Sequence, residues 1–275
     1  MSRKSLENTS SSIGLALCAW LLVGVLFGAL QRLPLLAGHT ALLLFTETAA
    51  LILAPLCAVL LMKNSFRTPL PLYVRRLECG GMGLFFCGIF ASQVLFGALG
   101  SAAALLFGAG AAENTLPQGG ALLVYCALRV TLVPLLEELL FRGHIMGRLL
   151  ACGDGTAVLL SSLLFALAHG SVLQLLPAFC SGIFLAMAAL RCGLGCSVLL
   201  HAANNALALL MLFLQHRGAG TLAQTVYIAA ALLCLIHVLL KHKKLPALTL
   251  RGVCLTPCFT APLAAAVLLM TAFLL

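Results

Sequence analysis

The sequence contains nine apolar stretches, most of them long enough to cross a lipid bilayer as a helix. They lie near residues 13–30, 40–62, 81–107, 120–141, 156–169, 172–190, 196–214, 222–240 and 252–275. A bilayer core about 30 Å thick requires about 20 apolar residues of helix, and only helices and closed barrels satisfy their backbone polar groups within it. With 63% apolar and 8% charged residues, the chain also falls far below the roughly 25% charge of soluble domains. We predict an all-α, polytopic transmembrane helical bundle of about 8–9 spans, with 156–169 the doubtful one.

The sixteen Lys and Arg residues gather in alternate loops. Thirteen lie in one set of loops, Arg32 and Arg217 lie in the opposite set, and Arg129 falls within a span. By the positive-inside rule, the N-terminus is expected to be cytoplasmic. This distribution explains the net charge of +9 without nucleic acid as a partner. The expected partner is the lipid bilayer, with the basic loops 63–76 and 241–251 against anionic headgroups.

The connections between the apolar stretches are short, and no internal repeat is visible. We therefore predict a single membrane domain over residues 1–275. The twelve cysteines form no CxxC pair and are interpreted as small helix-packing residues. The short loops favour a multi-pass protein of the bacterial cytoplasmic (inner) membrane.

Two adjacent carboxylates end the fourth apolar stretch, in a chain with only seven acidic residues. Residues four apart share a helix face, so Arg142 should lie over Glu138 as a structural ion pair. Glu137 points elsewhere and is left free to act as a base. An ionisable residue inside a span indicates a functional site by default. The alternative is that the two carboxylates only extend to the membrane interface and take part in an ordinary ion pair.

The helix that carries these carboxylates should have two further features. Pro134 cannot donate to the carbonyl of Val130 and is expected to bend the helix. The helix should also continue to about Leu150, because an exit at Arg142 would leave Glu137 too shallow to share a water molecule with His169. Separately, the intramembrane Glu47 and Arg129 are expected to pair with each other.

Two histidines lie in later apolar stretches, each with a partner four residues away. Phe165 places a ring beside His169, and His201 shares a helix face with Asn205. Each pair alone is also consistent with helix–helix packing. Taken together with Glu137, these side chains supply the parts for amide hydrolysis, in which the carboxylate activates water, His169 orients it, and His201 with Asn205 donates to an oxyanion.

The order EExxxR (137–142), FxxxH (165–169) and HxxxN (201–205) resembles the CPBP family of CAAX prenyl proteases and bacterial Abi proteins. The resemblance covers the helices of residues 120–215. It implies an intramembrane protease with catalytic Glu137, His169, His201 and Asn205, acting on a membrane-associated or lipidated peptide or protein. The family has been described both as glutamate-type and as metal-dependent. A zinc ion held by Glu137, His169 and His201 would suit the second type, although the spacing does not demand a metal.

Other protease classes lack their required parts in this sequence. No HExxH motif occurs, Asp154 is the only aspartate, and the stretch before Gly182 lacks the first glycine of a GxSG turn. The serious rival is a non-enzymatic immunity protein, scaffold or transporter in which the polar cluster only joins helices.

Overall fold

The computed structural model describes residues 3–34, 39–63, 81–106 and 116–245, together with positions 260 and 264. These residues are almost entirely helical, which confirms the all-α prediction. The helices are α1 (Arg3–Gln31), α2 (Thr40–Lys63), α3 (Met82–Leu106), α4 (Gly120–Ala127), α5 (Val133–Glu138), α6 (Gly147–Leu149), α7 (Asp154–Ala168), α8 (Val172–Cys192), α9 (Leu194–His216) and α10 (Gly220–Lys241).

Within the described residues, seven helical segments are long and apolar enough to cross a membrane. An eighth apolar helix, α7, has 15 residues, or about 22 Å at 1.5 Å per residue, and is too short for a core of about 30 Å. The predicted last span, 252–275, lies outside the described residues apart from two positions. The total span count and the cytoplasmic N-terminus therefore stay predictions.

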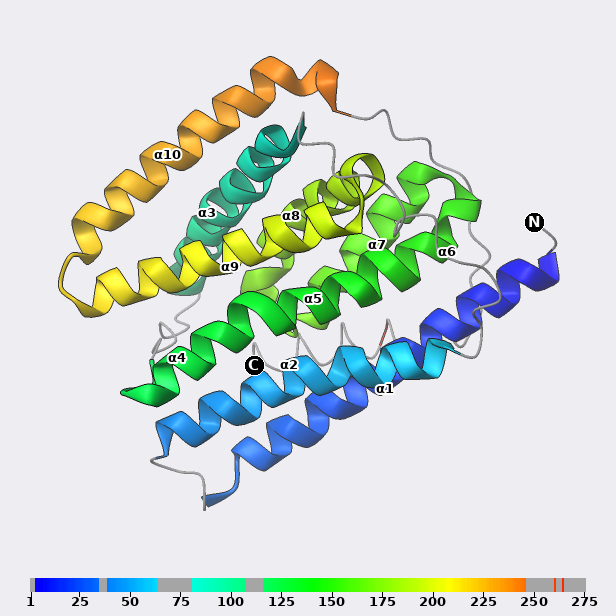
Figure 1. The fold of residues 1–275 in the computed structure, drawn as a ribbon, viewed down its shortest axis with the longest axis horizontal. Helices are drawn as coiled ribbons and strands as arrows, with labels where there is room; N and C mark the ends of the chain where they lie inside the picture. The colour runs from blue at the N-terminus through cyan, green and yellow to red at the C-terminus, as the bar shows by residue number, and fades with distance from the viewer. Residues whose placement is uncertain are drawn as a thin grey trace.

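Helices α4, α5 and α6 are parts of one continuous rod, residues 120–152 (Figure 1). Wider π-helical turns over Leu128–Leu132 and Leu139–Met146 join them, and a 3-10 turn, Leu150–Cys152, ends the rod. The predicted continuation of this helix to about residue 150 is confirmed. Because the N–H of Val133 bonds the carbonyl of Leu128, five residues back, the helix is already in π register where Pro134 interrupts its hydrogen bonds.

The rod, α7, α8 and α9 lie between two outer pairs of helices (Figure 1). Helices α1 and α2 pack together on one side, and α3 and α10 pack together on the other. Helix α7 is well enclosed, since ten of its fifteen residues are buried. A short helix can lie in this position because it does not have to reach both faces of the membrane.

The only tryptophan of the chain joins α1 to the end of α7. Its indole N–H donates to the carbonyl of Ala168 at 3.1 Å. The ring of Trp20 meets Phe141 edge-to-face at 5.4 Å, and Phe141 meets Phe165 in the same way at 5.4 Å. This series of aromatic rings fixes the backbone just before His169 against the N-terminal helix.

Close packing of α3 against α8 depends on a glycine. A Cβ atom at Gly88 would overlap the ring of Phe184, whereas a Cβ atom at Gly97, on the same helix, would meet nothing within 4 Å. Small residues at helix interfaces allow this close approach in membranes, where association relies on packing.

Substitution of Gly88 by alanine should therefore destabilise the bundle. Forcing a methyl group into a packed interface typically costs about 1–3 kcal/mol, which should lower the midpoint of thermal unfolding in detergent. Gly97→Ala is the matched control and should leave the midpoint unchanged or raise it. Equal effects of the two substitutions would contradict the packing of α3 on α8 described here.

Candidate active site

Glu137 and His169 are brought to the same depth by the turn between the rod and α7. Each lies sixteen residues from Gly153 along the chain, which is roughly 24 Å of ideal helix. Gly153 adopts φ 101°, a conformation that favours glycine, and there the chain reverses direction. Because the two helices run side by side from this turn, residues equally distant from it lie opposite each other.

The predicted catalytic side chains line one cavity of about 480 Å³. Glu137 lies in α5, His169 follows the last residue of α7, and His201 and Asn205 lie in α9. Three separate segments thus supply the carboxylate, the two imidazoles and the amide. The structure brings together all four residues to which the sequence assigned catalytic roles.

Glu138 is completely buried and surrounded by hydrogen-bond donors. Its Oε1 accepts from Nη1 of Arg142 at 2.8 Å and from Nδ1 of His201 at 2.9 Å, and its Oε2 accepts from the hydroxyl of Ser197. The predicted ion pair with Arg142 is confirmed. With both oxygens occupied, Glu138 is a positioning residue that links the rod to α9.

Arg142 is also fully buried, and α8 approaches it through a glycine. Its Nη2 donates to the carbonyl of Gly182 at 3.1 Å, and its guanidinium carbon lies 4.3 Å from the centre of the Phe165 ring. A Cβ atom at Gly182 would lie 3.3 Å from Nη2. Arg142 therefore ties α5, α7 and α8 together around the carboxylate of Glu138.

His201 lies between the two carboxylates. Because its Nδ1–H donates to Glu138, the ring is held with Nε2 toward Glu137, 3.6 Å from Oε2. A carboxylate on one ring nitrogen fixes the orientation of the imidazole and the position of its proton. Glu137 itself is 4% exposed and has no closer polar contact among the described residues, so its carboxylate is available to the cavity.

His169 is fixed by its own backbone and by Phe165. Its Nδ1 lies 2.8 Å from the carbonyl of Phe165, which places the proton of the neutral ring on Nδ1 and leaves Nε2 as an acceptor. The Phe165 ring meets His169 edge-to-face at 4.7 Å, and meets His201 in the same way at 5.6 Å. Phe165 thus spaces the two imidazoles instead of lying flat against one of them.

The π turn before Pro134 explains the position of Asn205. In π register Pro134 would bond the carbonyl of Arg129, but proline has no N–H. The side chain of Asn205 donates to this carbonyl at 3.0 Å. The π turn therefore adds the carbonyl of Arg129 to the groups that the missing N–H of Pro134 leaves open; the expectation for Val130 stays a prediction. One of the two N–H groups of the Asn205 amide makes this hydrogen bond, and the second N–H remains able to donate to another acceptor.

Several lining residues were not found from the sequence. Asn204 and Gln93 also face the cavity, and Gln93 donates to Ser181 at 3.0 Å. Ser197, one helical turn before His201, completes the row of residues 197, 201 and 205. This spacing of four was the available signal for Ser197, whereas Gln93 belongs to α3 and carries no motif.

The predicted pair of Glu47 and Arg129 forms the rim of the same cavity. Nη1 of Arg129 donates to Oε1 of Glu47 at 3.2 Å. The contact joins α2 to the rod and confirms the expectation. Both side chains are partly exposed, at 46% for Glu47 and 27% for Arg129.

The residues suggested for zinc do not form a ligand cluster. Glu137, His169 and His201 line one cavity, but no three His, Cys, Asp or Glu side chains among the described residues are arranged to hold a metal ion. Nδ1 of each imidazole is engaged by Phe165 or Glu138, which leaves Nε2 as the atom that would bind a metal. Metal dependence stays a prediction.

Replacing Arg142 with leucine should strongly destabilise the protein. The change leaves the buried Glu138 carboxylate without its cation, and breaking a buried pair in this way costs about 3–5 kcal/mol. Thermal unfolding in detergent measures the loss. Arg217→Leu, in an exposed turn, is the control and should change stability by no more than about 0.5 kcal/mol. A small effect of Arg142→Leu would mean that Glu138 does not depend on Arg142.

Glu47 and Arg129 should behave as a coupled pair. Each single change to leucine leaves one charge without its partner, so the double change should be less destabilising than the sum of the single changes. The expected coupling is about 1 kcal/mol, because both side chains are partly exposed. Unfolding midpoints of the four proteins in this cycle measure it, and strictly additive effects would exclude the pair.

A family model, described as type II CAAX prenyl endopeptidase Rce1-like, matches residues 119–207. The comparisons with curated proteins and with solved structures return no match. The matched segment is about a third of the chain and runs from the start of the rod to just beyond Asn205, so it includes all three motifs and the four side chains above. Residues 119–207 of this integral membrane protein are therefore similar to the CAAX-type endopeptidases that the model describes, over less than half of the chain.

Proposed function

We propose that the chain hydrolyses a peptide bond of a membrane-associated or lipidated peptide or protein, with Glu137 as the base that activates water. The observation that carries the proposal is the different environment of two adjacent carboxylates. Glu138 is saturated by three donors, whereas Glu137 faces the cavity together with both imidazoles. One carboxylate thus has a structural role while its neighbour remains available for chemistry.

In the proposed reaction, a water molecule binds between Glu137 and Nε2 of His169. Glu137 takes one proton as the water oxygen attacks the substrate carbonyl carbon. The carbonyl oxygen becomes an oxyanion and accepts hydrogen bonds from His201 and from the second N–H of Asn205. Donation by Nε2 of His201 requires the imidazolium form; the charges of His201 and Arg142 together balance the carboxylates of Glu137 and Glu138. Collapse of the intermediate breaks the C–N bond, and the proton held by Glu137 passes to the leaving amine.

An apolar groove beside the cavity supports a substrate with a lipid-like part. It has a volume of about 420 Å³ and is lined by α1 residues, including Trp20, Gly24 and Gly28, and by the end of α7. His169 lines both this groove and the polar cavity. An apolar portion of the substrate in the groove would place its polar backbone next to Glu137. As location we propose the bacterial cytoplasmic membrane, on the basis of the short loops.

The test is a fluorogenic peptide-cleavage assay in detergent, combined with thermal unfolding of the same variants. Glu137→Gln should reduce the cleavage rate by about 10²–10⁴-fold, the usual contribution of a general base, with little change in stability. His169→Ala should also lose most activity. Glu138→Gln is the matched control on the adjacent residue, and it should lose stability as well as activity.

Two results would contradict the proposal. One is full activity of Glu137→Gln, and the other is a loss of stability in Glu137→Gln as large as in Glu138→Gln, which would favour the non-enzymatic scaffold. The same assay with an added chelator tests whether the reaction requires a metal ion. If the chelator abolishes cleavage and zinc restores it, the reaction is metal-dependent; if cleavage is unchanged, the glutamate-type mechanism is supported.

A further inference from the structure

Asn204 is a buried amide in the Glu137 cavity to which the proposed reaction gives no role. It lies in α9, lines the cavity and is 8% exposed. Within the part of the chain that the structure describes, its carboxamide has no hydrogen-bond partner. The large majority of buried side-chain polar atoms are hydrogen-bonded, so this group requires a partner from outside the chain.

The other amide side chains that line this cavity are accounted for. Asn205 donates to the carbonyl of Arg129 at 3.0 Å. Gln93 donates to a serine of α8 at 3.0 Å, and Gln174 is exposed. The carboxylate and the two imidazoles have roles in the proposed chemistry. Asn204 is therefore the buried amide that is left without a function.

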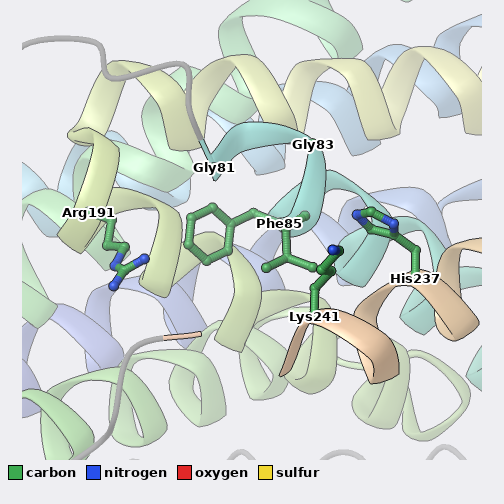
Figure 2. A pocket seen from close by; sticks show the side chains of 7 residues that line it. Gly81, Gly83, Phe85, Arg191, His237 and Lys241 are labelled. Atoms are coloured by element: carbon green, nitrogen blue, oxygen red, sulfur yellow. The ribbon is translucent and has the colours of Figure 1, made fainter. Parts of the chain in front are cut away.

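Another cavity, of about 300 Å³, lies where α3 begins and where α8 and α10 end (Figure 2). Its polar side chains, Arg191, His237 and Lys241, are exposed. It shares no described lining residue with the Glu137 cavity. A group that binds a substrate next to Glu137 must therefore come from the Glu137 cavity itself.

A role in joining helices does not explain Asn204. Amide side chains in membrane helices commonly hydrogen-bond to a neighbouring helix, as Asn205 does to the rod. Asn204 is the adjacent residue, about 100° away around α9, and makes no such bond to the described helices. Its two N–H donors and its carbonyl acceptor are therefore available to a molecule in the cavity.

A peptide main chain matches this group chemically. Each peptide unit offers one N–H donor and one carbonyl acceptor, and a carboxamide can accept from the first and donate to the second. A peptide that enters the bilayer needs partners for both groups, because lipid provides none. Asn204 carries no charge, so it suits a main chain better than a charged side chain.

The position of Asn204 places it one peptide unit from the reacting bond. It lies three residues beyond His201 on the same helix, a rise of about 4.5 Å. An extended chain advances about 3.3 Å per residue. With the scissile carbonyl at Nε2 of His201, the next peptide unit along the cavity therefore lies level with Asn204.

We propose that Asn204 binds the substrate main chain at the peptide unit next to the scissile bond, accepting from its N–H and donating to its carbonyl. The proposal rests on the proposed function and narrows its substrates to extended peptides with a free N–H beside the cleaved bond. In the protein without substrate, water takes the place of this peptide unit.

The first test is Asn204→Leu, a side chain of similar shape without polar atoms. With the fluorogenic peptide, KM should rise about tenfold, as expected for one or two lost hydrogen bonds. The kcat value should change by no more than about twofold, because the contact is made equally before and in the transition state. The midpoint of thermal unfolding should stay equal or rise, since no group of the protein loses its partner.

The matched control is Gln215→Leu, which removes an exposed amide of α9 outside the cavity. It should change neither KM nor kcat. Asn204→Gln keeps the amide on a longer side chain and should bind the peptide more tightly than Asn204→Leu.

The second test removes the N–H from the substrate. Two peptides each carry an N-methyl group on one of the two peptide bonds that flank the scissile bond. With the wild-type protein, one of them should raise KM about tenfold. With Asn204→Leu, the same N-methyl group should leave KM unchanged, because the contact is already lost.

Peptide binding separates this proposal from the proposed hydrolysis. Fluorescence anisotropy measures the affinity for the uncleaved peptide in Glu137→Gln and in the double variant with Asn204→Leu, which should bind about tenfold more weakly. If this difference is found but the wild-type protein cleaves nothing, the hydrolysis is wrong and the Asn204 contact stands. No saturable binding, equal affinities, a fall in kcat at unchanged KM, or a loss of stability as large as in Arg142→Leu would overturn the contact.

Discussion

The active-site arrangement depends on one buried carboxylate. Glu138 has no exposed surface, and a charge in such a position is tolerated only when donors surround it. Arg142, Ser197 and His201 are those donors, and they come from the rod and from α9. Satisfying this one group therefore fixes the two helices relative to each other and directs Nε2 of His201 toward Glu137. The residue that makes the site possible is thus the carboxylate that does not take part in the proposed chemistry.

The length of α7 and a π turn in the rod place the remaining groups. Helix α7 is too short to span a membrane, so it ends inside the bundle and leaves His169 at the depth of Glu137. The π turn before Pro134 leaves the carbonyl of Arg129 without a backbone partner, and Asn205 binds it. The π turn thus stands beside a side chain of the proposed site, a common location for π turns.

The family segment does not build the cavity alone. Gln93 from α3 and Glu47 from α2 line it, and α1 forms the apolar groove that reaches His169. These helices lie outside residues 119–207. The shared segment thus carries the proposed chemistry, while the flanking helices shape the approach to it. Substrate selection is therefore expected to depend on α1, α2 and α3.

The sequence by itself predicted the helical membrane fold, the Glu138–Arg142 and Glu47–Arg129 pairs, and four residues that the structure places around one cavity. It could do so because hydropathy, loop charge and a spacing of four residues are local properties of a helix. Only the tertiary structure decided that His201 binds Glu138, that Asn205 binds the carbonyl of Arg129, and that Gln93 joins the cavity. These contacts link residues far apart in the chain, and they depend on how helices are rotated and packed, which no local pattern encodes. The π turn before Pro134 was also not predictable. The proline is visible in the sequence, but the sequence does not show that the preceding N–H bonds the carbonyl five residues back instead of four.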